Sequence, residues 1–120
     1  MSVRSYRELQ VWQKGIELVK EVYRFASKFP KSETYGLTSQ IQRSAVSVPS
    51  NIAEGQARQH TGEFRQFVYV ALGSLAELDT QFEIAKQLTY ISENDFKAIQ
   101  KRIAELRKML HGLLNKLPKI

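Results

Sequence analysis

The sequence predicts an all-α protein, an antiparallel up-down-up-down four-helix bundle with left-handed packing. Apolar residues recur at alternating intervals of three and four in its long segments, which is the repeat of about 3.5 residues seen in helices packed at shallow angles. Short loops separate these segments, and the first two contain proline or glycine. No segment shows the strict alternation typical of a half-buried strand. The 120 residues contain no cysteine and are expected to form a single domain, 1–120.

The first helix is expected to run from Ser5 to about Phe29. Ser5 and Glu8 have the spacing of a capping box, and Pro30 ends the helix. Two apolar sets project about 120° apart on this helix. One set can fill the core, and the other requires a wide core or a second subunit. The first set is Leu9, Trp12, Ile16, Val19, Tyr23 and Ala26, and the second, our candidate oligomer interface, is Val11, Leu18, Val22, Phe25 and Phe29.

The second helix is expected to start after a turn in which Ser32 or Thr34 is the cap, and to end between Gly55 and Arg58. Pro49 lies within it, lacks an N–H and crowds the preceding turn, so we expect a kink at Pro49. An apolar stripe runs along this helix, and a polar stripe lies directly beside it. The polar stripe is too close to the core to be an ordinary solvent-exposed surface. The polar stripe is Gln40, Arg43, Ser47, Asn51 and Glu54.

The third helix is expected to open at Thr61, and the fourth to be capped by Ser92 and to end before Pro118. If the second and third helices fold back near residue 60, facing residues have numbers that sum to about 120. Arg43 then faces Glu77, and Ser47 faces Gly73 and Ser74. We therefore expect a partly buried Arg43–Glu77 ion pair within a structural polar network. That network is Arg43, Glu77, Ser47, Asn51 and Glu54.

Catalytic motifs are not found in the sequence. A metal site built from Asn51, Glu54 and Glu77 is disfavoured, because no glutamate of the sequence has a histidine three residues later, as in the Glu-x-x-His pattern of di-metal bundles. His60 and His111 each stand apart from other ligands. The chain also lacks the G-x-S-x-G motif and a phosphate-binding glycine loop. We expect no enzyme activity, no cofactor and no metal.

The charge is unevenly distributed. Eighteen Lys and Arg residues against twelve Asp and Glu give a net charge of +6, and seven basic residues against one acid lie between Lys97 and Ile120. A basic surface suits RNA or DNA, although a solvated face is the simpler interpretation. The N-terminus does not resemble a signal peptide and no apolar run is long enough to span a membrane, so a cytoplasmic location is expected. The candidate nucleic-acid contacts are Lys97, Lys101 and Lys108, with Arg102, Arg107, Arg58 and Arg65.

Several segments resemble one protein family. They include Leu9-Gln-Val-Trp12, Asn51-Ile-Ala-Glu-Gly55, Gly73-Ser-Leu75 and Glu77-Leu78, together with Gln40, Arg43, Ser44 and Ser47. The chain is similar to the 23S ribosomal RNA intervening-sequence proteins, also called S23 proteins, which are bacterial four-helix bundles. The resemblance extends to accessory proteins of diversity-generating retroelements, which form pentamers that engage nucleic acid and a reverse transcriptase.

What the resemblance implies is a homopentamer with nucleic acid and a reverse transcriptase as partners. Our leading hypothesis is therefore a non-enzymatic homo-oligomer that binds RNA or DNA with little sequence selectivity. The alternative is a protein-interaction module or scaffold whose charge serves only solubility.

Overall fold

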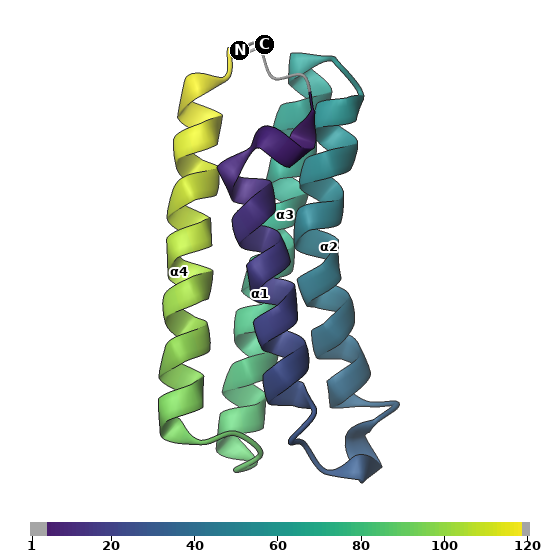
Figure 1. Cartoon of the computed structure of the whole chain (residues 1–120), viewed down its shortest axis with the longest axis vertical. Helices are drawn as coiled ribbons and strands as arrows, with labels where there is room; N and C mark the ends of the chain where they lie inside the picture. Colours follow the sequence, from purple (N-terminus) through teal and green to yellow (C-terminus); the bar gives the residue numbers. More distant parts are fainter. Residues whose placement is uncertain (1–4, 119–120) are drawn as a thin grey trace.

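The structure, a computed structural model, describes residues 5–118 of the chain and contains four long helices joined by short connections (Figure 1). No strand occurs among these residues. The elements in chain order are the short 3₁₀ helix η1 (Tyr6–Glu8), α1 (Gln10–Ala26), the 3₁₀ helix η2 (Lys31–Glu33), α2 (Leu37–Ala57), α3 (Thr61–Gln87) and α4 (Glu93–Lys116).

The four long helices form an antiparallel bundle. Each helix packs on its neighbours in the sequence, and α1 also packs on α4, so the helices stand in a ring around a shared core (Figure 1). The bundle measures 44 × 24 × 22 Å. Its core is a cluster of apolar side chains contributed by all four helices. The predicted all-α, four-helix fold is confirmed.

The first predicted helix is shorter in the structure than expected. The capping box forms, because the Ser5 Oγ accepts a hydrogen bond from the Arg7 N–H at 3.1 Å and the Ser5 N–H donates to Glu8 Oε2 at 3.1 Å. However, it caps only η1, since Leu9 has extended dihedral angles (φ −77°, ψ 127°) that interrupt the helix. The helix α1 then ends at Ala26, before Phe29.

The set of α1 residues expected at an oligomer interface is buried, whereas the other set is only partly buried. The predicted oligomer interface is wrong, because its residues are at most 6% exposed and lie in the core of the single chain; they are Val11, Leu18, Val22, Phe25 and Phe29. In the other set, Ile16 is 37% and Tyr23 44% exposed. The reason is the rotation of α1: its contacts with α2 and α4 turn the second set toward the bundle axis.

Pro49 is buried at the contact between α1 and α2. A Cβ on Gly15 of α1 would lie 3.2 Å from the Pro49 Cβ, so these two backbones approach closely. The helix α2 is assigned without a break from Leu37 to Ala57. A bend at Pro49 stays a prediction.

The start of α2 is capped by a residue that sequence reasoning did not select. Neither Ser32 nor Thr34 caps this helix; instead Glu33 Oε1 accepts a hydrogen bond from the Leu37 N–H at 3.0 Å. The Tyr90 hydroxyl donates to Glu33 Oε2 at 2.9 Å. These two hydrogen bonds hold the pKa of Glu33 below its ordinary value, and the bond to Glu33 raises the pKa of Tyr90.

Candidate nucleic-acid interface and a polar groove

A hydrogen bond between two serines shows the register of α2 against α3. The Ser47 and Ser74 hydroxyls lie 2.8 Å apart. The Asn51 side-chain amide donates to the Ser47 carbonyl at 2.7 Å and to the Ser47 Oγ at 2.9 Å. The predicted pairing of Ser47 with Ser74 is confirmed, and it places the polar stripe of α2 along α3.

The predicted ion pair between Arg43 and Glu77 is wrong. Both side chains are exposed, and no ion pair within 4.0 Å joins them in residues 5–118. They instead line a groove of about 270 Å³ between α2 and α3. The polar groove, as we name it, is formed by Gln40, Arg43, Ser44, Ser47, Glu77 and Gln81.

The reason for the missing pair is position on the helices. The buried seam between α2 and α3 is occupied by Ser44, Ser74 and Gln81, each at most 7% exposed, so the two charges lie at the rim. Glu54 pairs along its own helix, because Arg58 donates to it at 2.9 Å. This hydrogen bond raises the pKa of Arg58.

Gln81 was not selected from the sequence as a site residue. It is 7% exposed, and its side-chain carbonyl oxygen is the one buried side-chain nitrogen or oxygen atom of the described residues without a hydrogen-bond partner. The sequence signal was weak, because Gln81 is one of several polar residues along the flank of a helix. Only the packing of α2 against α3 shows that it is enclosed.

Three lysines form a separate surface on α4. Lys97, Lys101 and Lys108 are exposed, and no described acid lies within ion-pair distance of them. We call these three residues the lysine row. They lie on the face of α4 opposite the buried Ile99, Ile103 and Leu106, as helical spacing predicts.

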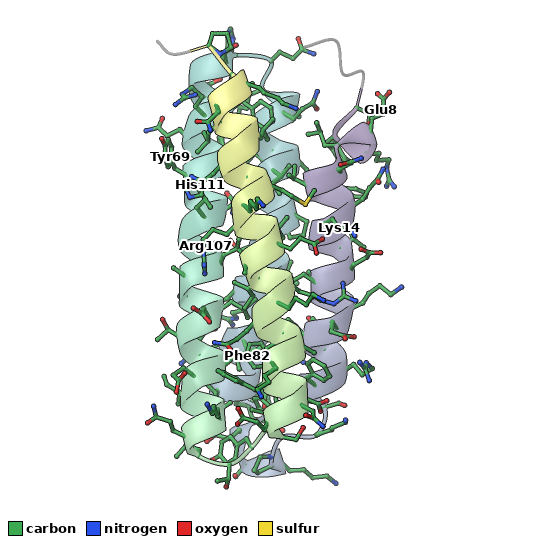
Figure 2. The ribbon with its side chains drawn as sticks, turned by 90° about the vertical axis from the view of Figure 1, so that its left-hand side faces the viewer. Glu8, Lys14, Tyr69, Phe82, Arg107 and His111 are labelled. Atoms are coloured by element: carbon green, nitrogen blue, oxygen red, sulfur yellow. The ribbon has the colours of Figure 1, made fainter. Side chains whose placement is uncertain are left out.

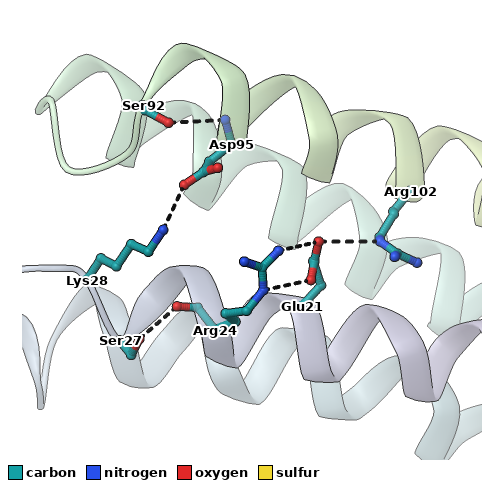
Figure 3. Close-up of polar contacts among 7 residues, drawn as sticks. All are labelled: Glu21, Arg24, Ser27, Lys28, Ser92, Asp95 and Arg102. Atoms are coloured by element: carbon teal, nitrogen blue, oxygen red, sulfur yellow. Dashed lines mark hydrogen bonds and ion pairs between the residues drawn. The ribbon is translucent and has the colours of Figure 1, made fainter.

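The acids of α4 are engaged by neighbouring helices. Lys28, in the connection between α1 and α2, donates a hydrogen bond to Asp95 at 3.3 Å. The Lys14 Nζ of α1 lies 3.6 Å from the Glu105 Oε1. Figure 3 shows the Lys28–Asp95 contact beside Ser92, whose hydroxyl accepts from the Asp95 N–H at 3.1 Å and caps α4 as predicted. The lysine row is consequently left without a neutralising partner.

The four predicted arginines differ from the lysines in that each has a partner. Arg102 lies 3.8 Å from Glu21 (Figure 3), and Arg107 lies 3.8 Å from Asp79. Arg58 contacts Glu54 and, at 3.7 Å, Glu63. Arg65 donates to the carbonyls of Leu114 at 2.8 Å and Leu117 at 3.3 Å, so it caps the end of α4. A role of these arginines in binding stays a prediction.

Arg107 and His111 lie on α4 and face the same side of the molecule as Tyr69 of α3, as the labelled side chains of Figure 2 show. Tyr69 is 55% exposed.

Within residues 5–118, no group of three His, Asp or Glu residues could hold a metal ion, and none of the helices there combines the length and the apolar character needed to cross a bilayer.

A larger hollow of about 580 Å³ lies at one end of the bundle. It is formed by η1, the connection between α2 and α3, and the end of α4, and its lining includes Tyr6, His60, Phe64 and Lys116. The helix α3 begins beside it without a side-chain cap at His60. Its lining is mixed in character and brings no set of catalytic groups together.

Comparison with known proteins gave two findings. A family model described as "23S rRNA-intervening sequence protein" matches residues 7–112. A crystal structure of a protein of unknown function from the S23 ribosomal protein family of Bacteroides thetaiotaomicron superimposes with a TM-score of 0.78. The two chains are 23% identical, and the match covers 87% of this chain and 97% of that one. No curated protein matched the sequence.

Proposed function

Because the chain belongs to the 23S rRNA-intervening sequence protein family, we propose that it is a non-enzymatic homo-oligomer that binds RNA or DNA through the lysine row of α4. The observation that carries this proposal is the row itself: three exposed lysines with no acid partner among the described residues, on a helix whose own acids pair with lysines of other segments.

The row matches a phosphate backbone better than a base edge. Lys97 and Lys108 are eleven residues apart, which is about 16 Å along a helix, so the three charges can follow a stretch of one strand. Lysine presents a point charge to phosphate, and phosphate contacts position a protein without reading sequence. We therefore propose binding with little sequence selectivity.

Self-association is supported by an apolar strip on the outer side of α1 and α2. Ile16 and Tyr23 are exposed there, beside the half-buried Trp12 and Val19. The contact of Gly15 with Pro49 places Val46 of α2, which is 40% exposed, level with Val19. We call these five residues the apolar strip and propose that a second copy covers it.

An oligomer would strengthen weak binding, because several lysine rows could contact one nucleic acid at once. The pentamer, and a reverse transcriptase as protein partner, rest on the resemblance alone and remain part of the proposal. The same applies to a cytoplasmic location. The second candidate function is a protein-interaction module, in which a different protein covers the apolar strip.

Nucleic-acid binding is tested with a triple variant, Lys97→Gln, Lys101→Gln and Lys108→Gln. Three phosphate contacts predict a log–log salt slope of about −2.7 on duplex DNA, or about 40-fold weaker binding between 50 and 200 mM salt. The triple variant should lose this slope. Fluorescence anisotropy with labelled RNA and DNA measures both quantities.

The matched control is Lys20→Gln, Lys31→Gln and Lys116→Gln, which removes the same charge outside the row. The control should keep the slope of the wild type. Equal affinities and slopes for the two triple variants would show that the row is not the binding surface. No binding by the wild type at low salt would reject the nucleic-acid function altogether.

Self-association is tested by light scattering of the wild type and of Ile16→Glu. The variant should reduce the molar mass to that of one chain while the helical circular dichroism signal is kept. Tyr35→Glu is the control, because Tyr35 is 97% exposed and lies outside the strip. A wild type that is monomeric at all concentrations contradicts self-association and leaves the protein-interaction module as the better candidate.

A further inference from the structure

The polar groove between α2 and α3 has no role in the proposed function, because it lies away from α4 and its lysine row. The helices α2 and α3 are neighbours in the bundle, while α2 and α4 lie diagonally across its core (Figure 1). All six residues that line the groove are polar or charged. Seams between packed helices are ordinarily apolar, so this composition calls for a chemical explanation.

A residue that lines the groove carries an acceptor that the described residues do not satisfy. The Gln81 side-chain carbonyl oxygen is buried, and no donor of the described residues reaches it. Buried polar atoms nearly always have a partner, so this acceptor is satisfied only when the Gln81 side chain turns to meet a donor from outside the chain.

The charges at the rim add two further requirements. Glu77 supplies an anionic acceptor four residues before Gln81, so the two acceptors are neighbours on one face of α3. Arg43 supplies a cationic donor from α2 on the other side. Neither Arg43 nor Glu77 takes part in an ion pair within residues 5–118. A complementary molecule therefore needs clustered N–H donors at one end and an anion at the other.

We propose that the polar groove binds a small zwitterion that carries a guanidinium group and a carboxylate, as free arginine does. A guanidinium is a planar fork of five donors, so it can donate to the Glu77 carboxylate and, once the Gln81 side chain turns toward the groove, to the Gln81 carbonyl at the same time. The ligand carboxylate accepts hydrogen bonds from Arg43. The volume of about 270 Å³ accommodates a molecule of this size.

The test is isothermal titration calorimetry of the full chain with three probes. L-arginine should bind saturably. Agmatine lacks the carboxylate and L-citrulline lacks the charge of the guanidinium, so each should bind at least about tenfold more weakly, as expected for the loss of one charged hydrogen bond. Glu77→Gln and Arg43→Gln should each weaken L-arginine by a similar factor.

The controls separate binding from folding. Arg43 and Glu77 are exposed, so their variants should retain the circular dichroism spectrum and the unfolding midpoint of the wild type. Glu83→Gln removes an acid of α3 outside the groove and should leave the affinity unchanged. In Gln81→Leu the buried acceptor is absent, so L-arginine binding should fall while the fold is kept.

Two results overturn the proposal. One is the absence of saturable heat with L-arginine up to about 10 mM, which would mean that the groove holds solvent only. The other is binding that Glu77→Gln, Arg43→Gln and Gln81→Leu leave unchanged, which would place the ligand elsewhere. Neither result depends on whether the lysine row binds nucleic acid.

Discussion

The close approach of α2 and α3 at Gly55 can be tested with a single methyl group. A Cβ on Gly55 would lie 2.6 Å from the Phe67 Cβ and 3.1 Å from the Phe64 Cδ1. Carbon atoms pack best at about 3.5 to 4.0 Å, so α3 would have to move by about 1 Å. The Phe67 Cβ is attached directly to the backbone and cannot rotate away. Gly55→Ala should therefore force the two helices apart.

The magnitude follows from two opposing contributions. Replacing glycine by alanine inside a helix gains about 1 kcal/mol, whereas overpacking a close contact costs about 1 to 3 kcal/mol. Gly73→Ala is the matched control, because a Cβ there meets nothing within 4 Å and only the gain applies. The free energies of unfolding of the two variants should differ by about 2 kcal/mol, with Gly55→Ala the less stable.

Thermal and urea unfolding followed by circular dichroism measure this difference. For a chain of this length it corresponds to about 8 °C between the two midpoints. If Gly55→Ala is as stable as Gly73→Ala, the backbones are not in contact at this point. The register of α2 against α3, on which the polar groove depends, would then be wrong.

Three further predictions concern the helix ends and the core. Ser92→Ala removes the hydroxyl that caps α4 and should lower the free energy of unfolding by about 1 kcal/mol in urea melts, whereas Ser92→Asp, which can still accept the same hydrogen bond, should not. The pKa of Glu33 is lowered by the folded state, so its contribution to stability is present above the unfolded pKa and is lost as the pH falls through the folded pKa. Glu33→Gln should thus flatten the decline of stability at acidic pH, and an unchanged pH profile would contradict the cap. Leu18→Ala should lower the free energy of unfolding by about 2 to 5 kcal/mol, because Leu18 is 1% exposed. A loss of stability as small as that of Ile16→Ala would contradict the burial of Leu18.

The lysine row and the apolar strip are separate surfaces, because charged residues are unevenly distributed among the helices. The three acids of α4 pair with lysines of other segments, which are Lys14 of α1, Lys28 of the α1–α2 connection and Lys86 of α3. Arg107 of α4 pairs with Asp79 of α3, while the lysine row keeps no acid partner among the described residues. The outer side of α1 and α2 exposes the apolar strip. These two surfaces lie on different parts of the ring of helices, so a partner on the strip would leave the lysine row open.

The sequence determined the features that depend on local chain properties. The spacing of apolar residues predicted the four helices, because a side chain's face on a helix depends only on its number. The Ser92 cap was predicted for the same reason, since its partner Asp95 lies three residues away. The Ser47–Ser74 contact was also predicted, because a short loop fixes the register of two antiparallel helices.

Only the tertiary structure decided which apolar face of α1 is buried. Both faces have a helical repeat, and the contacts with α2 and α4 select the set that contains Leu18 and Val22. The tertiary structure also decided how the polar residues of α2 and α3 are placed. Arg43 and Glu77 lie at the edge of the polar groove without pairing, while the Gln81 side-chain oxygen is buried. The physical reason is that burial and pairing depend on the rotation of each helix about its axis, which is set by packing against distant segments and not by local sequence.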